Sequence, residues 1–361
     1  MLALKREQKP WGAGVPVFPG RLWTASGRAN RAKIPKVQNY PPPLSVYFSD
    51  IEHLAGILQA AGFPLQLRQL EGGRCSGQLQ RLQLGSLQLL QIQLNRSLVV
   101  TGDKAVERML LCLSLAPLGP SAVGLQSHGH SLGEAALYGL DSQRPIHLVT
   151  PSCYSLAIAS INRDLLFTQA EALGAPDLAK LLGHSNVLSL HHGRLGELRR
   201  CVTALFARPA AAPGPPLQNE LLPLLIEAIV DGKEREQGIQ RQPPRFDIVQ
   251  MAERWALENP GIPISLDGLC RQVHASRRSL IQGFNEHLGM APMRFIRLQR
   301  LHGVRRALLE AEPTETSVAE LSGTWGFSSS GHFSRNYQRL FGELPSQTLQ
   351  RTPREVRWLC L

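Results

Sequence analysis

A repeated helical segment near the C-terminus constrains this chain more than any other feature. Residues 276–292 and 329–345 align at a separation of 53 positions, with a serine, two hydrophobes, a glycine and a proline in step. The aligned pairs are Ser276 and Ser329, Leu280 and Phe333, Phe284 and Tyr337, Gly289 and Gly342, and Pro292 and Pro345. A short helical unit duplicated within one chain indicates a protein that holds a repeating polymer at two places, and the DNA duplex fits that pattern best.

Each copy of the repeat completes a helix-turn-helix pattern. Such a unit places one helix across the DNA backbone and a second helix in the major groove. A serine in a capping position and apolar residues three to four positions apart mark each helix. We expect helices at 265–274 and 276–288 with a turn at Ala275, and helices at 317–325 and 329–341 with a turn at 326–327.

A long helix is expected between the two copies, at about residues 292–310. Its apolar stripe consists of Leu298, Leu301, Val304 and Leu308, and the arginines at 297, 300, 305 and 306 lie off that stripe. At about 1.5 Å per residue the helix spans roughly 27 Å. Because successive major-groove faces are about 34 Å apart, this helix predicts two recognition helices near adjacent grooves.

Several short motifs in this region occur in a characteristic order: Arg305-Arg306-Ala307-Leu308-Leu309, Trp325-Gly326-Phe327, His332-Phe333-Ser334-Arg335 and Phe341-Gly342-Glu343-Leu344-Pro345. They resemble the AraC/XylS family of bacterial transcription regulators over roughly residues 246–351. Within that family, residues 276–280 and 304–306 are most similar to the ethanolamine-operon regulator. The resemblance implies a C-terminal DNA-binding domain and an N-terminal domain that senses an effector and dimerises.

The family's base-reading positions carry over onto the outward faces of the two recognition helices. They fall on Arg278, Ile281, Gln282, Gly331, His332 and Arg335. Arginine suits guanine and glutamine suits adenine, so Arg335 and Gln282 have side chains suited to base edges. Ile281 and Gly331 have no side-chain hydrogen bonds to offer. Phosphate contacts are expected from Ser276, Arg277, Ser329 and Arg339, whereas Trp325, Phe333 and Tyr337 are expected in the core.

The middle of the chain changes period. Residues 78–84 and 87–94 alternate apolar and polar side chains on either side of Gly85-Ser86, with Leu90 as the exception, which predicts a β-hairpin with one buried face. Further strands are expected at 109–115 and 145–161, and helices at 46–62, 163–182 and 195–207. The domains are therefore predicted as a β-rich effector or dimerisation domain at 46–207, a linker with a helix at 208–244, and a double helix-turn-helix domain at 246–351.

The net charge of +11 is concentrated at the two ends of the chain. Residues 1–41 hold eight Lys or Arg and one acidic residue, residues 42–244 hold sixteen of each, and residues 245–361 hold fifteen against eleven. Residues 1–43 are basic, contain many Gly and Pro, and are predicted to be a disordered tail. No apolar run reaches the roughly 18–20 residues of a membrane span, and no signal-peptide pattern is present. A cytoplasmic bacterial protein, associated with the nucleoid when bound to DNA, is expected.

A short motif in the middle section favours a different class of protein. Gly129-His130-Ser131-Leu132-Gly133 fits G-x-S-x-G and resembles the nucleophile elbow of acyltransferases, with Ser131 as the nucleophile. An elbow needs a buried strand before it, but residues 124–129 are polar, and no histidine lies between His192 and His274. We therefore expect a glycine-rich loop between strands, with an acyltransferase or hydrolase as the alternative function.

Metal chemistry has little support in the sequence. His128, His130, His184, His191 and His192 gather in the middle section, but no carboxylate or cysteine spacing joins them. The six cysteines show no CxxC pair, so neither a zinc site nor a disulfide framework is expected. The histidines are expected in loops, and no cofactor is predicted.

Together these patterns predict an α+β protein with a β-rich, barrel-like sensing domain and an all-α domain with two helix-turn-helix units joined by a long helix. The expected function is sequence-specific regulation of transcription, without enzymatic activity. The expected partners are a double-stranded DNA operator, RNA polymerase, a small-molecule effector and a second copy of the chain. Activation is expected from the family resemblance, and the sequence does not identify the effector-binding residues.

Overall fold

The computed structural model describes residues 43–119, 123–141, 143–182, 186–207, 218–234 and 245–351. The predicted tail at 1–43, except for its last residue, lies outside the described residues. So do His184 and the segments 208–217 and 235–244 of the predicted linker. The domain boundaries stay a prediction.

The part of the chain before residue 235 contains the strands and five helices among the described residues. The helices are α1 (Ile51–Ala60), α2 (Arg163–Ala172), α3 (Leu178–Leu182), α4 (His192–Ala207) and α5 (Gln218–Val230). The strands are β1 (Leu44–Phe48), β2 (Gln66–Gln69), β3 (Gly77–Leu84), β4 (Leu87–Leu94), β5 (Leu98–Gly102), β6 (Arg108–Ser114), β7 (Gln126–Ser127), β8 (His130–Ser131), β9 (Ala136–Tyr138), β10 (Ile146–Val149), β11 (Tyr154–Asn162), β12 (Val187–Ser189) and β13 (Lys233–Glu234).

The strands form two antiparallel sheets. One has eight strands in the order β1-β3-β4-β11-β6-β9-β12-β13, and the other has five in the order β2-β5-β10-β7-β8. The predicted hairpin at 78–94 is confirmed as β3 and β4, which pair from Gly77 with Leu94 to Leu84 with Leu87. Gly85 occupies the left-handed region in the two-residue turn, with φ of 59°, which a hairpin turn of this length favours.

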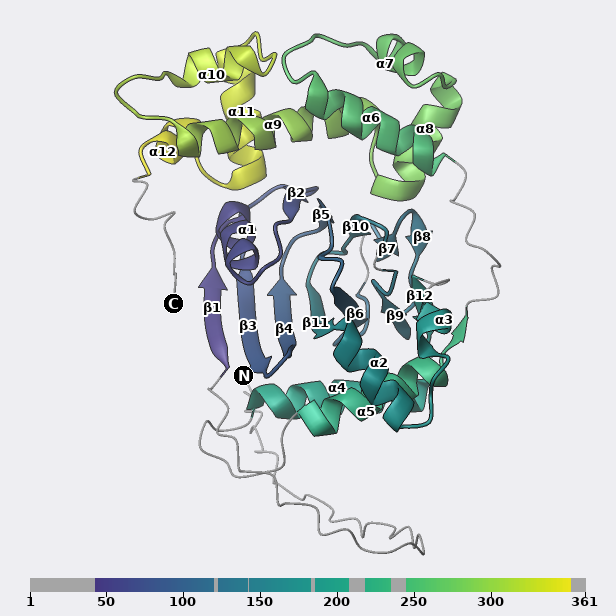
Figure 1. The fold of residues 1–361 in the computed structure, drawn as a ribbon. Coiled ribbons are helices and arrows are strands. Elements are labelled where there is room, and N and C mark those ends of the chain that lie inside the picture. The colour runs from purple at the N-terminus through teal and green to yellow at the C-terminus, as the bar shows by residue number, and fades with distance from the viewer. Residues whose placement is uncertain are drawn as a thin grey trace, which may run out of the picture. The chain divides into compact units, whose positions relative to one another are not determined.

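Two apolar cores form on the faces of these sheets. In one, Leu82, Leu89, Leu111 and neighbouring side chains pack against α2–α5, with α4 and α5 side by side (Figure 1). Leu221, Leu225 and Ile229 of α5 are fully buried there, so the helix of the predicted linker packs into the β-rich part. The other core lies under α1 and includes Phe48, Leu54 and Leu156.

The predicted helix at 163–182 is broken into α2 and α3. Leu173 ends α2, and Gly174 follows in the left-handed region with φ of 80°. Pro176 then lacks the amide that a continuing helix needs. The predicted helix at 46–62 begins later, because residues 44–48 extend the eight-stranded sheet before Asp50 caps α1 through the amide of His53 at 2.8 Å.

Helices are the only regular secondary structure in residues 245–351. These are α6 (Phe246–Glu258), α7 (Leu266–Gln272), α8 (Arg277–Leu288), α9 (Pro292–Glu310), α10 (Val318–Thr324), α11 (Ser330–Phe341) and α12 (Pro345–Leu349). The long helix α9 joins the α7–α8 pair to the α10–α11 pair (Figure 1). The expected α+β class is confirmed, although the strands form two sheets and not one closed barrel. None of the helices in the described part of the chain is long and apolar enough to cross a membrane.

Candidate nucleic-acid interface

The two helix-turn-helix units repeat each other in their capping bonds. The hydroxyl of Ser265 accepts the amide of Gly268 at the start of α7, and the hydroxyl of Ser317 accepts the amide of Glu320 at the start of α10, both at 3.1 Å. These bonds satisfy amides that the first turn of a helix leaves unpaired. The sequence repeat thus extends to equivalent local structure.

The second helix of each unit is anchored by the residues that the repeat pairs. Leu280 and Phe284 of α8 are fully buried. Phe333 and Tyr337 of α11 are exposed by no more than 1%. Gly289 and Gly342 end the two helices in the left-handed region, with φ of 64° and 74°. The expected core residues Phe333 and Tyr337 are confirmed, and Trp325 is partly buried against the same core.

The predicted base-reading residues lie on the solvent side of α8 and α11. Arg278 and Ile281 are exposed on α8, and with Gln282, Asn285 and Glu286 they line a shallow surface hollow. Gly331, His332 and Arg335 are exposed on the first turns of α11. Each set thus gathers on one outward face of its helix.

Some of these side chains are bonded to their own helix. The amide of Gln282 donates to Glu286 Oε1 at 2.8 Å, and Arg245 pairs with the same carboxylate at 3.1 Å. Arg335 Nε donates to the carbonyl of Gly331 at 3.2 Å. These contacts are solvent-exposed, so exchanging them for other hydrogen-bond partners costs little free energy.

The predicted phosphate-contacting residues differ in their local bonds. Ser276 is the cap of α8, and its hydroxyl accepts the amide of Ser279 at 3.1 Å. Arg277 forms a two-pronged exposed ion pair with Asp267 of α7, and this hydrogen bonding holds the pKa of Asp267 below its usual value. Ser329 and Arg339 are exposed at opposite ends of α11. To contact a phosphate, Arg277 must either break its ion pair with Asp267 or bind both groups at once.

A buried arginine that the helical pattern missed positions the second recognition helix. Arg305 is 1% exposed, and its guanidinium lies 2.5 Å from Glu343 Oε1 and 3.4 Å from the hydroxyl of Tyr337 on α11. Glu343 also pairs with Arg351. A buried charge is tolerated only when it is paired in this way, so this cluster fixes α11 against α9.

The β-rich part donates hydrogen bonds to the C-terminal turns of both recognition helices. Gln126 Nε2 donates to the carbonyl of Glu286 on α8 at 3.0 Å. The amide of Gly73 donates to the carbonyl of Arg339 on α11 at 2.9 Å. The last carbonyls of a helix lack partners within the helix, so these donors act as caps supplied from another part of the chain. No local sequence pattern predicts them.

Ser131 does not lie in a nucleophile elbow. It belongs to β8, which pairs with β7 around a turn at His128 and Gly129, and no helix follows it directly. An elbow requires a strand-to-helix turn at the nucleophile. The expected loop between strands is thus a tight hairpin.

The expectation that the middle-section histidines lie in loops is wrong for His130, which is in β8, and for His192, which begins α4. His128 lies in the turn between β7 and β8. Its side chain is buried, and its Nε2 contacts the carbonyl of Pro145 at 2.8 Å. Among the residues that the structure describes, no group of three or more His, Cys, Asp or Glu side chains has the arrangement of a metal site.

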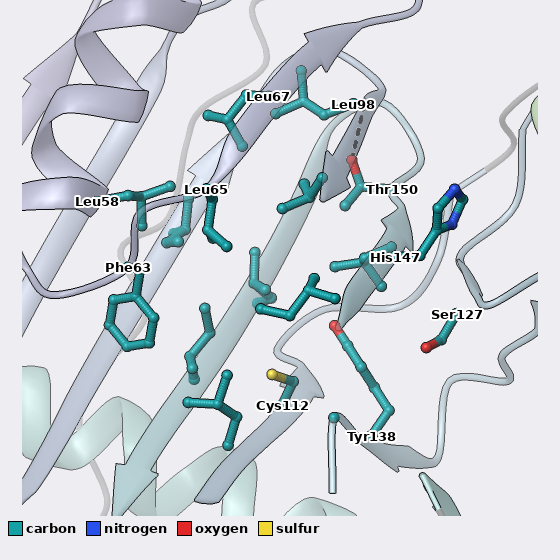
Figure 2. A pocket seen from close by; sticks show the side chains of 18 of the residues that line it. Leu58, Phe63, Leu65, Leu67, Leu98, Cys112, Ser127, Tyr138, His147 and Thr150 are labelled. Atoms are coloured by element: carbon teal, nitrogen blue, oxygen red, sulfur yellow. Dashed lines mark hydrogen bonds between the residues drawn. The ribbon is translucent and has the colours of Figure 1, made fainter. Parts of the chain in front are cut away.

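A cavity of about 80 Å³ opens between the two sheets and α1. Figure 2 shows Leu58, Phe63, Leu65 and Leu67 along one side of it, and Ser127, His147 and Thr150 towards the other. No sequence pattern predicts these residues as a group, because they come from several strands that only the fold brings together.

Comparison with known proteins places the helical part among described regulators. A helix-turn-helix domain family matches residues 269–351. The XylDLEGF operon transcriptional activator 2 of Pseudomonas putida is 34% identical over 125 residues, which cover 35% of this chain and 77% of that protein. The XylDLEGF operon transcriptional activator 1 of Pseudomonas putida is 36% identical over 135 residues, 37% of this chain, and the match spans only 39% of that protein.

A solved structure is also similar. The crystal structure of a probable AraC family transcriptional regulator from Rhodopseudomonas palustris CGA009 is 34% identical and covers 29% of this chain and 95% of that chain, with a TM-score of 0.27. Two helix-turn-helix units on one connecting helix define a double DNA-binding module. The match to the XylDLEGF operon transcriptional activator 2, which covers 77% of that relative, shows that the chain belongs to the AraC/XylS family of transcription regulators.

Proposed function

We propose that this chain is a sequence-specific DNA-binding regulator, of the activator type, that inserts α8 and α11 into successive major grooves. The observation that carries the proposal is the duplicated unit, in which each recognition helix is anchored by buried hydrophobes and presents polar residues to solvent. The 19 residues of α9 span roughly 27 Å at about 1.5 Å per residue. That length suits two helices serving adjacent grooves.

The base-reading roles are assigned by side-chain chemistry. Arg335 is the candidate for contact with guanine, and Gln282 is the candidate for contact with adenine. Gln282 must first break its hydrogen bond to Glu286. Arg278 and His332 supply further donors, whereas Ile281 and Gly331 contribute shape and apolar contact. Phosphate contacts position the protein on the DNA backbone, and they are assigned to Ser276, Arg277, Ser329 and Arg339.

Control by a small effector is part of the same proposal. The apolar cavity lies in the β-rich part, and that part bonds directly to the ends of both recognition helices. A ligand that favours one arrangement of these contacts would shift DNA binding. RNA polymerase and a second copy of the chain are the protein partners that the family resemblance implies, in the cytoplasm.

Selection of bound sequences from random duplex DNA by the full-length chain tests the function. We expect an enriched motif with two boxes about one helical turn apart. On the selected site, Arg335→Ala should lose about 1–3 kcal/mol of discrimination against a changed base. Arg200→Ala, an exposed arginine of α4, is the control and should bind like the wild type. Sequence-blind binding by the wild-type chain would overturn the proposal.

Ser131→Ala separates this function from the hydrolase alternative. Its expected effect on DNA binding is nil, because Ser131 lies on β8, outside both recognition helices. The same variant and the wild type should be indistinguishable in ester-hydrolysis assays. A hydrolytic activity that disappears with the Ser131 hydroxyl would restore the enzyme alternative.

A further inference from the structure

The wall of the cavity between the two sheets is apolar over most of its extent. Its side chains come from α1, the loop before β2, and strands of both sheets, and they include Leu58, Phe63, Leu67, Ile92 and Leu156. A charged group moved from water to such a wall loses its hydration, and without a compensating partner that loss is large. The ligand must therefore be mainly hydrocarbon, and any charge on it needs a partner at the polar margin.

The cationic groups at that margin are already engaged. The ammonium of Lys104 donates to the carbonyls of Gly139 and Asp141 at 3.0 and 2.5 Å. Burial lowers the pKa of Lys104, and the nearby Asp141 carboxylate opposes that shift. An anionic ligand would have to draw Lys104 away from the two carbonyls.

The two histidines of the wall are engaged as well. Burial lowers the pKa of His128 to about 4, so its ring is neutral near pH 7. Its two nitrogens lie 3.0 Å from Ser127 Oγ and 2.8 Å from the carbonyl of Pro145. His147 Nε2 lies 3.3 Å from Glu253 Oε2 on α6, and Figure 2 shows its ring directed away from the leucine side chains.

The neutral polar groups are bonded to one another as well. The hydroxyl of Thr150 accepts the amide of Leu98 at 3.1 Å. The hydroxyl of Tyr138 lies 2.9 Å from that of Tyr154, and Asn186 Nδ2 donates to Ser127 Oγ at 3.1 Å. A strongly polar ligand would have to break such bonds, and each group left unpaired costs about 1–3 kcal/mol.

We propose that this cavity binds an uncharged, hydrophobic small molecule. The inference rests on the proposed control of DNA binding by an effector, and it names the chemical class of that effector. An uncharged ligand gains by replacing water at the leucine and phenylalanine side chains, and it leaves the bonds of Lys104, His128 and Thr150 intact. A single ligand hydroxyl is acceptable, because it can exchange hydrogen bonds at the margin without carrying charge.

Three probes of equal chain length separate the charge types: octan-1-ol, octanoate and octylammonium. Isothermal titration calorimetry of the full-length chain should show saturable binding of octan-1-ol, with a Kd at least tenfold lower than that of either ion. Tighter binding of octanoate would overturn the proposal and assign Lys104 as the partner of an anionic ligand. Saturable binding of none of the three would overturn it as well.

Variants that fill the cavity locate the binding site. Ile158 lines the cavity and is partly buried, so Ile158→Phe should weaken octan-1-ol binding at least tenfold. Cys112→Leu is a second filling variant with a larger increase in volume. Leu165→Phe is the matched control, since Leu165 is a partly buried residue of α2 that packs in the other core. Equal octan-1-ol binding by all three variants would place the probe outside the cavity and overturn the proposal.

The calorimetry contains no DNA, so its outcome is separate from that of the proposed function. Sequence-selective binding to the selected DNA site without octan-1-ol binding would overturn only the ligand class. Octan-1-ol binding by a chain that ignores DNA sequence would support the cavity and overturn the regulator. Circular dichroism of each variant verifies that a loss of binding is not a loss of folding.

Discussion

The ring of His302 accepts a hydrogen bond from the backbone amide of Gln69, with 3.0 Å between Nε2 and the amide nitrogen. His302 is buried on α9 and Gln69 ends β2, so this bond joins the long helix to the β-rich part. A ring nitrogen that accepts a hydrogen bond is unprotonated. Burial lowers the pKa of His302 to about 3, and the charges of Arg68 and Arg305 act in the same direction.

This bond predicts that mild acid destabilises the protein. The pKa of His302 is about 6.5 in the unfolded chain and lower in the folded protein. Neutral His302 therefore adds to the free energy of unfolding above pH 6.5, and this contribution is lost as the pH falls towards 3. Between pH 7 and 5 the loss from His302 should be about 2 kcal/mol, since one pKa unit corresponds to about 1.4 kcal/mol. Urea unfolding at several pH values and fixed ionic strength measures it, and His302→Gln should remove that part of the slope.

His128 offers an independent comparison, because burial lowers its pKa to about 4 within the β-rich part. His128→Gln should likewise reduce the loss of stability between pH 7 and 5. The variant that carries both His128→Gln and His302→Gln should show the smallest change of stability with pH. A His302→Gln protein whose stability falls with pH as steeply as that of the wild type would show that His302 is not held neutral.

The side chain of Gln69 predicts a second loss of stability. Its Nε2 donates to the carbonyl of Leu340 in the last turn of α11 at 3.1 Å, and also to the carbonyl of Gly73. Gln69→Leu keeps most of the volume but removes the donor, which should cost about 1–3 kcal/mol for the carbonyls left unpaired. Urea unfolding measures the loss.

Gln83→Leu is the matched control for that change. Gln83 donates to Gly85 in an exposed contact within its own hairpin, so the control should change the free energy of unfolding by less than about 0.5 kcal/mol. Equal effects of the two substitutions would mean that the Gln69 contact to α11 contributes nothing to stability.

The two recognition helices could be predicted closely from the sequence because their determinants are local. Ser276 and Gly289 lie within one turn of the ends of α8, and Leu280 and Phe284 are four positions apart on one face. Caps and helical stripes depend only on neighbours along the chain. The same holds for the β3–β4 hairpin, whose register follows from Gly85 and the alternation on either side.

The contacts that hold these helices to the rest of the protein could not be predicted in that way. Arg305 lies off the apolar stripe of α9, yet it is 1% exposed. Its burial is tolerated because Glu343 and Asp50 approach it from distant parts of the sequence. The sequence around Asp50 predicts only that this residue caps a helix. It does not predict the ion pairs that Asp50 forms with Arg305 and Arg351.

The turns of the two helix-turn-helix units predict stability changes of opposite sign. Gly326 has φ of 78°, and His274, at the equivalent place in the first unit, has φ of 49°. A residue with a side chain is strained there and glycine is not. We therefore expect His274→Gly to stabilise the protein by about 1 kcal/mol.

Gly326→Ala should destabilise it by more than His274→Gly stabilises it, because an added Cβ would also lie 3.2 Å from the backbone carbonyl oxygen of Gly261 and 2.8 Å from the guanidinium of Arg300. Thermal or urea unfolding of the two variants beside the wild type measures both changes. Two changes of the same sign would refute the assigned equivalence of the turns.

A single sheet separates the cavity from the first helix-turn-helix core. Within β5, Leu98 and Val100 pack in the core that surrounds the cavity, while Val99 between them packs in the core that contains α6 and α8. Along β10, Leu148 packs on the cavity side, and His147 is bonded to Glu253 of α6. Side chains alternate across a strand, so a ligand that shifts β5 or β10 also shifts residues touching the DNA-binding helices.

Glu253 therefore should transmit cavity occupancy to DNA binding. In the wild type we expect octan-1-ol to change the affinity for the selected DNA site by about 5–150-fold, the usual range of such coupling. Glu253→Gln keeps the shape but replaces the carboxyl group that contacts His147, and should reduce that change at least threefold with the octan-1-ol Kd within twofold of wild type. Glu258→Gln, at the exposed end of α6, should retain the full effect. Full coupling in Glu253→Gln would exclude the pair as the route between the sites.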